Sequence, residues 1–288
     1  MPYETLVDVD TLATQLGRSS WRIVDCRFTL ADPDAGAREH ARATIPGAIY
    51  ANLDQDLSAP VIPGHTGRHP LPSREGFAAT LSRWGIDADT QVVVFDDMGG
   101  AFAARLWWML RWVGHRAVAV LDGGLAAWTA AGHPLAPGEA LEREPTRFEP
   151  GEPLVTWVSA DEVLAALPDP TVVVLDARAA PRYRGENETT DPIAGHIDGA
   201  RSAPFIENLG EGGRFRSPEQ LRARFEERLA GTRPERAVVY CGSGVTACHD
   251  VLAMVHAGLP APRLYPGSWS EWITDPSRPR ATGDEQLG

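Results

Sequence analysis

The sequence contains no lysine, because all 27 basic residues among its 288 are arginine. This absence excludes a lysine Schiff base, whether to a carbonyl substrate or to pyridoxal phosphate. It also excludes a Gly-Lys-Ser/Thr phosphate loop and a lysine general base. Since every fixed positive charge is a guanidinium, cationic recognition in this chain suits planar oxyanions such as carboxylates.

Other features are also missing. No apolar run approaches the roughly 18 residues that span a membrane, and no basic segment with an apolar core opens the chain. The three cysteines, Cys26, Cys241 and Cys248, are too few and too scattered for a disulfide framework or a zinc site. We therefore expect a cytoplasmic protein with no metal and no membrane partner. The formal charge of −12 argues against nucleic acid as a partner.

What the sequence does contain is an internal repeat. The length predicts two domains, and 43% hydrophobic residues with nine tryptophans suffice for two cores. Blocks from the first half recur in the second half in the same order, which indicates a duplicated domain. The matching pairs are residues 7–12 with 158–163, 23–27 with 174–178, 45–48 with 197–200, 73–75 with 217–219, and 92–96 with 237–241.

The repeat predicts the domain boundaries and the fold class. Residues 137–153 are rich in proline and read as an extended linker between an N-terminal domain, 1–136, and a C-terminal domain, 154–288. In both copies short apolar runs, which suit buried strands, alternate with segments of helical spacing. We expect two tandem α/β domains, each a parallel β-sheet flanked by helices on both faces.

The two copies differ at the end of one strand, where the first has Asp96 and the second has Cys241. Gly242 and Gly244 follow the cysteine and allow the loop to curl with its backbone N–H groups turned inward. The loop runs into a helix N-terminus, which adds partial positive charge and favours a thiolate. The pattern predicts a reactive Cys241 and a first copy without that nucleophile; the alternative is a buried structural cysteine.

Several motifs together resemble the two-domain rhodanese family of sulfurtransferases, in which the N-terminal copy is inactive and the C-terminal copy is catalytic. The most specific is the loop Cys241-Gly242-Ser243-Gly244-Val245-Thr246, which is similar to the 3-mercaptopyruvate branch of that family. The other matching blocks are residues 25–27, 45–48, 69–72, 121–124, 176–178, 182–185, 195–197 and 267–272.

The resemblance implies a mechanism and a set of site residues. Cys241 would take a sulfane sulfur from a small-molecule donor as a persulfide, with residues 242–246 around it, and would pass it to a thiol, such as thioredoxin, or to cyanide. Arg182 would bind the donor's anionic group, and Ser243, His69 and Asp54 would relay a proton. No cofactor is implied.

One departure leaves the donor open. The 3-mercaptopyruvate branch has a second arginine nine residues after Arg182, where this chain has Asp191. An acidic side chain there would repel a donor carboxylate unless it points away or pairs with Arg184. The alternative donor is thiosulfate, with cyanide as acceptor.

Two further alternatives concern the class of protein, and a third concerns the role of Cys248. A cysteine-dependent phosphatase would need an arginine six residues after Cys241, where this chain has Ala247. A non-enzymatic sulfur carrier would form the persulfide without rapid release to small acceptors. Cys248 could form a regulatory disulfide or pack in a helix as a small hydrophobe.

Overall fold

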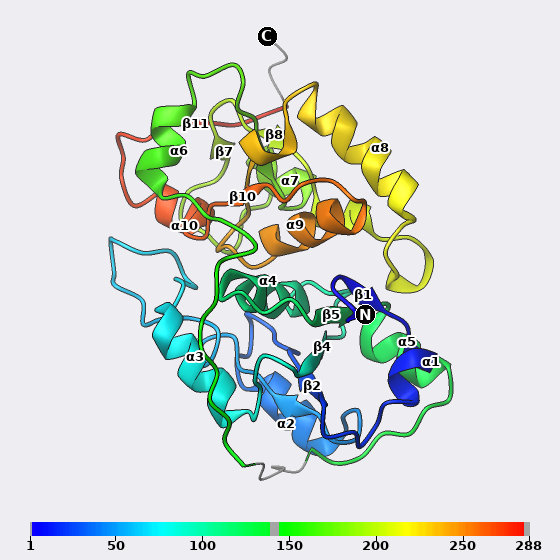
Figure 1. The fold of residues 1–288 in the computed structure, drawn as a ribbon. Helices are drawn as coiled ribbons and strands as arrows, with labels where there is room; N and C mark the ends of the chain where they lie inside the picture. Colours follow the sequence, from blue (N-terminus) through cyan, green and yellow to red (C-terminus); the bar gives the residue numbers. More distant parts are fainter. Residues whose placement is uncertain (1, 139–143, 285–288) are drawn as a thin grey trace. The chain divides into compact units, whose positions relative to one another are not determined.

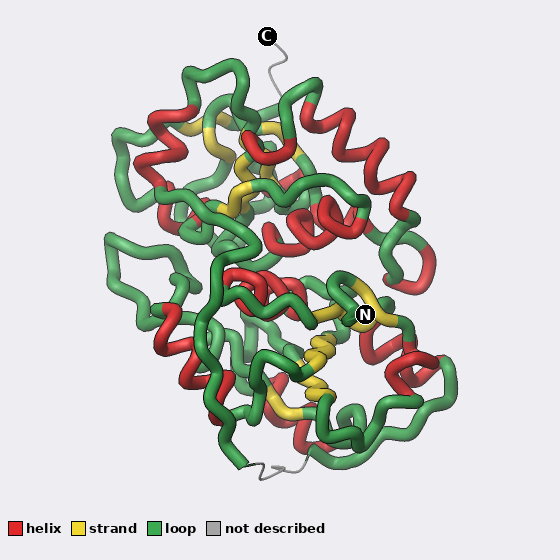
Figure 2. Tube along the Cα trace, in the orientation of Figure 1, coloured by secondary structure: helices red, strands yellow, loops and turns green. Residues whose placement is uncertain are grey.

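The computed structural model describes residues 2–138 and 144–284. The chain divides into two compact units, the first comprising Met1–Ala59, Leu71–Leu154 and Gly210–Phe215, the second Pro60–Pro70, Val155–Leu209 and Arg216–Gly288. Each unit thus includes a short segment from the other half of the sequence. The boundaries predicted above stay a prediction; linker residues 139–143 lie outside the described part, and the rest of the linker is loop (Figure 2).

The first unit is built on a five-stranded parallel sheet with the strand order β1-β5-β4-β2-β3 (Figure 1). Every residue of its middle strand, β4, is buried, so helices and loops cover both faces. Its elements are β1 Leu6–Val7, α1 Val9–Ala13, β2 Trp21–Asp25, α2 Ala35–Arg42, β3 Ile49–Tyr50, α3 Arg74–Arg83, β4 Gln91–Phe95, α4 Ala103–Trp112, β5 Val118–Leu121, α5 Gly124–Ala130 and the 3-10 turn Glu211–Gly213.

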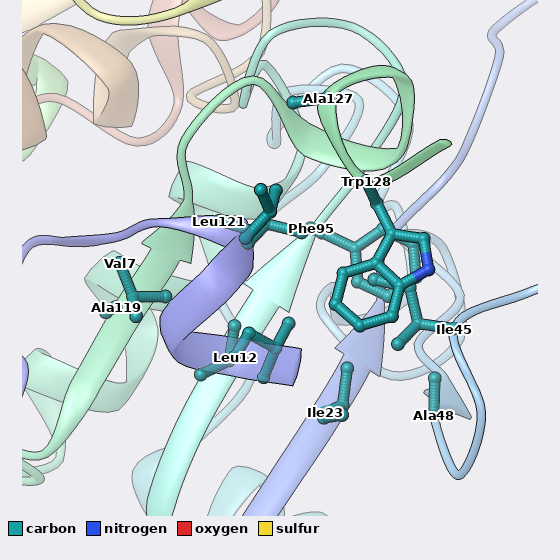
Figure 3. Close-up of a cluster of buried hydrophobic side chains, with 12 residues drawn as sticks. Val7, Leu12, Ile23, Ile45, Ala48, Phe95, Ala119, Leu121, Ala127 and Trp128 are labelled. Carbon is teal, nitrogen blue, oxygen red and sulfur yellow. The ribbon is translucent and has the colours of Figure 1, made fainter. Parts of the chain in front are cut away.

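Alternate residues of this sheet supply one of its cores. Figure 3 shows Ile23, Phe95 and Leu121 pointing from neighbouring strands toward Leu12 of α1 and Trp128 of α5. The side chains of Leu12 and Trp128 are fully buried. Because strand side chains alternate between faces, the intervening β4 residues face the other side, where α4 packs on β4 and β5.

The second unit repeats this topology in a shorter form. Its four-stranded parallel sheet has the order β10-β9-β6-β8, and Trp157 bridges Leu264 in parallel at the edge where β1 lies in the first unit. A two-stranded antiparallel pair, β11-β7, stands apart from it. The elements are α6 Ala160–Ala166, β6 Val174–Asp176, α7 Ala180–Tyr183, β7 His196–Ile197, β8 Arg201–Ser202, the 3-10 turns Phe205–Asn208 and Pro234–Arg236, α8 Pro218–Leu229, β9 Val238–Tyr240, α9 Ala247–His256, β10 Arg263–Leu264, α10 Ser268–Trp272 and β11 Arg280–Ala281.

A buried ion pair recurs at the same place in both units. Asp25 ends β2 and accepts hydrogen bonds from the Arg27 guanidinium at 2.6–3.1 Å; Asp176 ends β6 and accepts the same set from Arg178. Each arginine also donates to a backbone carbonyl, Arg178 to that of Gly195 at 2.7 Å. The fold class predicted from the repeat, two α/β domains with parallel sheets, is confirmed.

Local sequence features account for the bounds of several elements. Ser159 forms a capping box with Glu162 at the start of α6, and the apolar run Gln91–Phe95 is β4 over its whole length. The β-branched run that begins at Thr171, in contrast, becomes strand only at Val174. Thr171 instead closes a turn, because its N–H and hydroxyl groups both donate to Asp169 Oδ1. In the described residues, no helix has the length and apolar character needed to cross a bilayer.

Candidate functional site

Cys241 follows the last residue of β9 and begins the loop that leads into α9. The thiol is buried, with the residue 2% exposed. Its backbone is fixed from outside the loop, since Cys241 N–H donates to Ser268 Oγ at 3.0 Å and its carbonyl accepts from Trp269 N–H at 3.0 Å. The thiol therefore has a fixed position at the carboxyl end of a buried strand.

The loop presents a backbone N–H group to the sulfur. Gly244 N–H donates to Cys241 Sγ at 3.2 Å. Gly244 has a φ of +75°, and an ideal Cβ there would lie 2.2 Å from the Pro266 carbonyl oxygen, so only glycine fits this turn. This contact agrees with the inward-turned loop expected from the sequence.

The first unit holds a carboxylate in the equivalent loop. Asp96 follows β4 as Cys241 follows β9, and its two oxygens accept four backbone N–H groups, from Met98, Gly100, Phe102 and Ala103, at 2.8–2.9 Å. Asp96 is fully buried, and burial raises the pKa of its carboxyl group against the lowering effect of these hydrogen bonds. The loop in this fold thus gathers N–H donors around one acidic side chain.

Two of the three predicted relay residues lie together. His69 Nδ1 and Ser243 Oγ are 2.7 Å apart, and both residues are buried. Both residues belong to the second unit, which includes Pro60–Pro70. Asp54 belongs to the first unit, where its N–H donates to Asn52 Oδ1 at 2.9 Å. Its place in the relay stays a prediction.

Arg182 lies beside the loop with one edge of its guanidinium already bound. Its Nε and Nη2 donate to Glu188 at 3.1 and 3.0 Å, and Nη2 also donates to Asp191 at 2.9 Å. Burial alone would raise the pKa of Glu188, but Arg182 and the N–H groups of Asp191 and Thr190 hold it below its ordinary value. Arg182 Nη1 lies 3.6 Å from an ideal Cβ on Gly242.

Of the two arrangements in which Asp191 would not repel a donor carboxylate, the pairing with Arg184 does not occur among the described residues. Arg184 binds Glu186 at 2.9–3.0 Å, on the exposed side of α7. Asp191 is instead bridged by Arg182 and Arg68, and its side chain is only 1% exposed. Glu188 also accepts a hydrogen bond from Asp191 N–H at 3.0 Å, so the backbone of Asp191 is held beside Arg182.

Sequence reasoning missed Arg68. Its guanidinium binds Asp191 through Nη1, and its Nη2 lies 3.0 Å from an ideal Cβ on Gly242. One signal in the sequence could have pointed to it, because Arg68 directly precedes His69, a predicted site residue. The pairing itself joins residues too distant in the sequence for any local pattern to predict.

The remaining loop residues and cysteines have structural contacts. Val245 is buried and Thr246 is the N-cap position of α9. Cys248 Sγ donates to the Gly244 carbonyl at 3.4 Å inside α9. Cys26 is buried in the first unit, where burial raises the pKa of its thiol well above the usual range. Within the described residues, no group of three or more His, Cys, Asp or Glu side chains is placed to hold a metal.

A family model described as a rhodanese-like domain matches residues 8–131 and again residues 159–275. The chain belongs to the rhodanese family. The two matches agree with the duplication seen in sequence and topology. The family resemblance inferred from the motifs is confirmed.

Relatives of this rhodanese-family chain carry two activity names. A Pseudomonas aeruginosa protein named “Probable 3-mercaptopyruvate sulfurtransferase” is 53% identical over 280 residues, covering 97% of this chain and 98% of the relative. Thiosulfate sulfurtransferase of Bos taurus is 36% identical, covering 88% and 84%. Among solved structures, 3-mercaptopyruvate sulfurtransferase from Leishmania major has a TM-score of 0.82 at 34% identity, covering 93% of this chain and 74% of that one.

Proposed function

We propose that this protein is a sulfurtransferase that moves sulfur from 3-mercaptopyruvate to a thiol or to cyanide through a persulfide on Cys241. The observation that carries the proposal is the Cys241 loop, in which a buried thiol accepts a backbone N–H bond from Gly244 at the head of α9. The similarity to the Pseudomonas aeruginosa relative supports this donor over thiosulfate.

The chemistry has two displacement steps. The Cys241 thiolate attacks the donor sulfur, an S–S bond forms, and the donor C–S bond breaks with its electron pair moving into the carbonyl. The resulting enolate takes up the proton that the donor thiol carried and becomes pyruvate. An acceptor thiolate, for example that of thioredoxin, then attacks the outer sulfur and releases Cys241. Backbone N–H groups of residues 242–246 stabilise the anionic persulfide.

The contact between Ser243 and His69 supports a role for both residues in moving the proton of the first step. The hydroxyl and the imidazole share a short hydrogen bond beside the thiol loop, so a proton can pass between them and the forming enolate. Asp54 is proposed as the carboxylate that orients His69.

A cytoplasmic location is also proposed, because the protein has few cysteines and those described are free thiols.

The proposal is tested by intact-mass measurement after donor treatment. Wild-type protein incubated with 3-mercaptopyruvate should gain the mass of one sulfur, and Cys241→Ser should gain none, because only Cys241 forms the persulfide. Cys248→Ser is the matched control and should gain sulfur as the wild type does. A thiol chase should return the original mass; a persulfide that resists the chase would indicate a carrier instead of an enzyme.

The second candidate donor is thiosulfate, which the bovine relative's name favours. Steady-state kinetics with both donors decide between them. We expect a higher kcat/KM for 3-mercaptopyruvate, and a higher value for thiosulfate would reverse the assignment. No sulfur gained on Cys241 from either donor would contradict every sulfur-transfer proposal.

A further inference from the structure

We propose that Arg68 is a second donor-binding residue of the Cys241 site, and that Asp191 is the positioning residue that holds Arg68 and Arg182 in one clamp for the donor's carboxylate. The proposal rests on the proposed sulfurtransferase function and adds a residue that the sequence motifs do not indicate. It begins from a juxtaposition within the second unit: two guanidinium groups flank Gly242, the residue that follows the thiol.

The backbone around Arg68 is fixed on the second unit at three adjacent residues. Arg68 N–H donates to Ser270 Oγ at 3.1 Å, and His69 binds Ser243 at 2.7 Å. Gly67 packs so closely that an ideal Cβ there would lie 2.4 Å from the Gly267 carbonyl oxygen. Because α10 and the Cys241 loop hold these residues, the direction of the Arg68 side chain is set by the site.

Asp191 joins the two arginines through different oxygens. Its Oδ1 accepts from Arg68 and its Oδ2 accepts from Arg182 Nη2 at 2.9 Å. A carboxylate bridged by two guanidinium groups and 1% exposed directs no uncompensated charge at an incoming anion. The acidic residue that argued against a carboxylate donor thus serves as the link that keeps two cations together.

Each arginine keeps donors on the side that faces Gly242. In the part of the chain that the structure describes, the acceptors of Arg182 bind its Nε and Nη2. Its Nη1 carries no such bond and lies 3.6 Å from the ideal Gly242 Cβ. Arg68 is bound through Nη1, which leaves Nη2, 3.0 Å from the same point, and a buried Nε with no acceptor in the described residues. Unused donors on two partly exposed guanidinium groups match the two oxygens of one carboxylate.

The clamp is tested by separating donor binding from sulfur transfer. Arg68→Gln should raise KM for 3-mercaptopyruvate about tenfold or more with a smaller change in kcat, since it removes a charged hydrogen bond to the substrate. Asp191→Asn should raise KM less, because both arginines remain. Arg68→Lys should raise KM less than Arg68→Gln does, because lysine keeps the positive charge but lacks the planar pair of donors of a guanidinium. Arg184→Gln is the matched control and should leave KM unchanged, because in the described residues this neighbouring guanidinium pairs with Glu186 and Asp284 and not with Asp191.

A binding measurement keeps the test independent of turnover. Pyruvate, which carries the same carboxylate, should bind to the Cys241→Ser protein. Adding Arg68→Gln to that protein should raise the dissociation constant for pyruvate about tenfold. Unchanged KM and unchanged pyruvate affinity in folded Arg68→Gln protein would overturn the clamp. Failure of the wild type to form a persulfide would instead contradict the proposed function, while pyruvate binding would still report on the clamp.

Discussion

At the scale of single residues, the site depends on backbone positions that only glycine can occupy. Gly244 combines a left-handed φ with the N–H bond to Cys241, and a methyl group there would meet the Pro266 carbonyl at 2.2 Å. The loop could avoid that clash only by moving Gly244 N–H away from the sulfur. Side-chain substitution at this residue therefore acts on catalysis and stability together.

We predict that Gly244→Ala lowers kcat/KM at least tenfold, since a charged acceptor loses an N–H group worth about 1.5–3 kcal/mol. Gly199→Ala is the matched control, because Gly199 has a φ of +79° with no atom within 4 Å of an ideal Cβ. Gly199→Ala should lower the free energy of unfolding by about 1 kcal/mol, which is the cost of an alanine in the left-handed conformation, and should leave kcat/KM unchanged. Equal activity losses in the two variants would show that backbone strain, not the N–H contact, matters.

Residue types in the Cys241 loop were predictable from the sequence, whereas the arginine pairing was not. Cys241 was found because Gly242 and Gly244 follow it and because the other copy has Asp96. Those are local signals. Arg68 meets Asp191 only when the chain folds, and the same charge pattern along the sequence equally allowed a pairing of Asp191 with Arg184.

At the scale of elements, the loops after β4 and β9 occupy equivalent positions in the two units and share one local structure. Each follows a fully buried parallel strand, leads into a helix and directs backbone N–H at the side chain that follows the strand, through four groups at Asp96 and through Gly244 at Cys241. In the first unit the anion is built in as Asp96, whose oxygens use four N–H groups. The same loop geometry thus accommodates a carboxylate in one unit and a thiol in the other.

We predict that Asp96→Ala lowers the free energy of unfolding by about 2–5 kcal/mol, since it removes the acceptor of four backbone N–H groups, two of them in buried and two in partly buried hydrogen bonds. Asp97→Asn, a change at the exposed next residue, should alter stability by less than about 0.5 kcal/mol. Urea unfolding of both variants measures the difference. A small effect of Asp96→Ala would mean that water or a rearranged loop satisfies those groups.

Element types and order were predictable because apolar strands and capped helices are local features. The start of β6 was not, because Asp169 competes for the N–H and hydroxyl of Thr171 and keeps the chain in a turn until Val174. A β-branched run in the sequence does not reveal that competition.

At the scale of the whole molecule, the repeat predicted the fold class because duplicated sequences adopt the same topology. The equivalent strand orders of the two sheets follow from it. The exchange of short segments between the units could not be predicted from the repeat, since no sequence pattern in residues 60–70 indicates that they pack with the second half. That exchange places His69 and Arg68 at the Cys241 loop.

Global stability should also depend on one buried acid close to the site. Asp250 lies in α9, fully buried; its Oδ1 accepts from Asn208 at 2.6 Å, and its Oδ2 has no partner in the described residues. Burial raises the pKa of Asp250 to about 7, although Arg224 and Asn208 oppose the shift. The folded protein therefore holds a proton there that the unfolded chain releases near its ordinary pKa of 3.8.

The sign of the pH effect follows from this difference in bound protons. A raised carboxyl pKa stabilises the fold fully at low pH, and this contribution falls as pH rises from about 4 to about 7, by about 1.4 kcal/mol per unit of pKa difference. Asp250→Asn stays neutral, so we expect its stability relative to wild type to increase between about pH 5 and about pH 8 in urea unfolding. A difference that is the same at both pH values would show that Arg224 keeps Asp250 ionised throughout, and that the charge is stabilised inside the core.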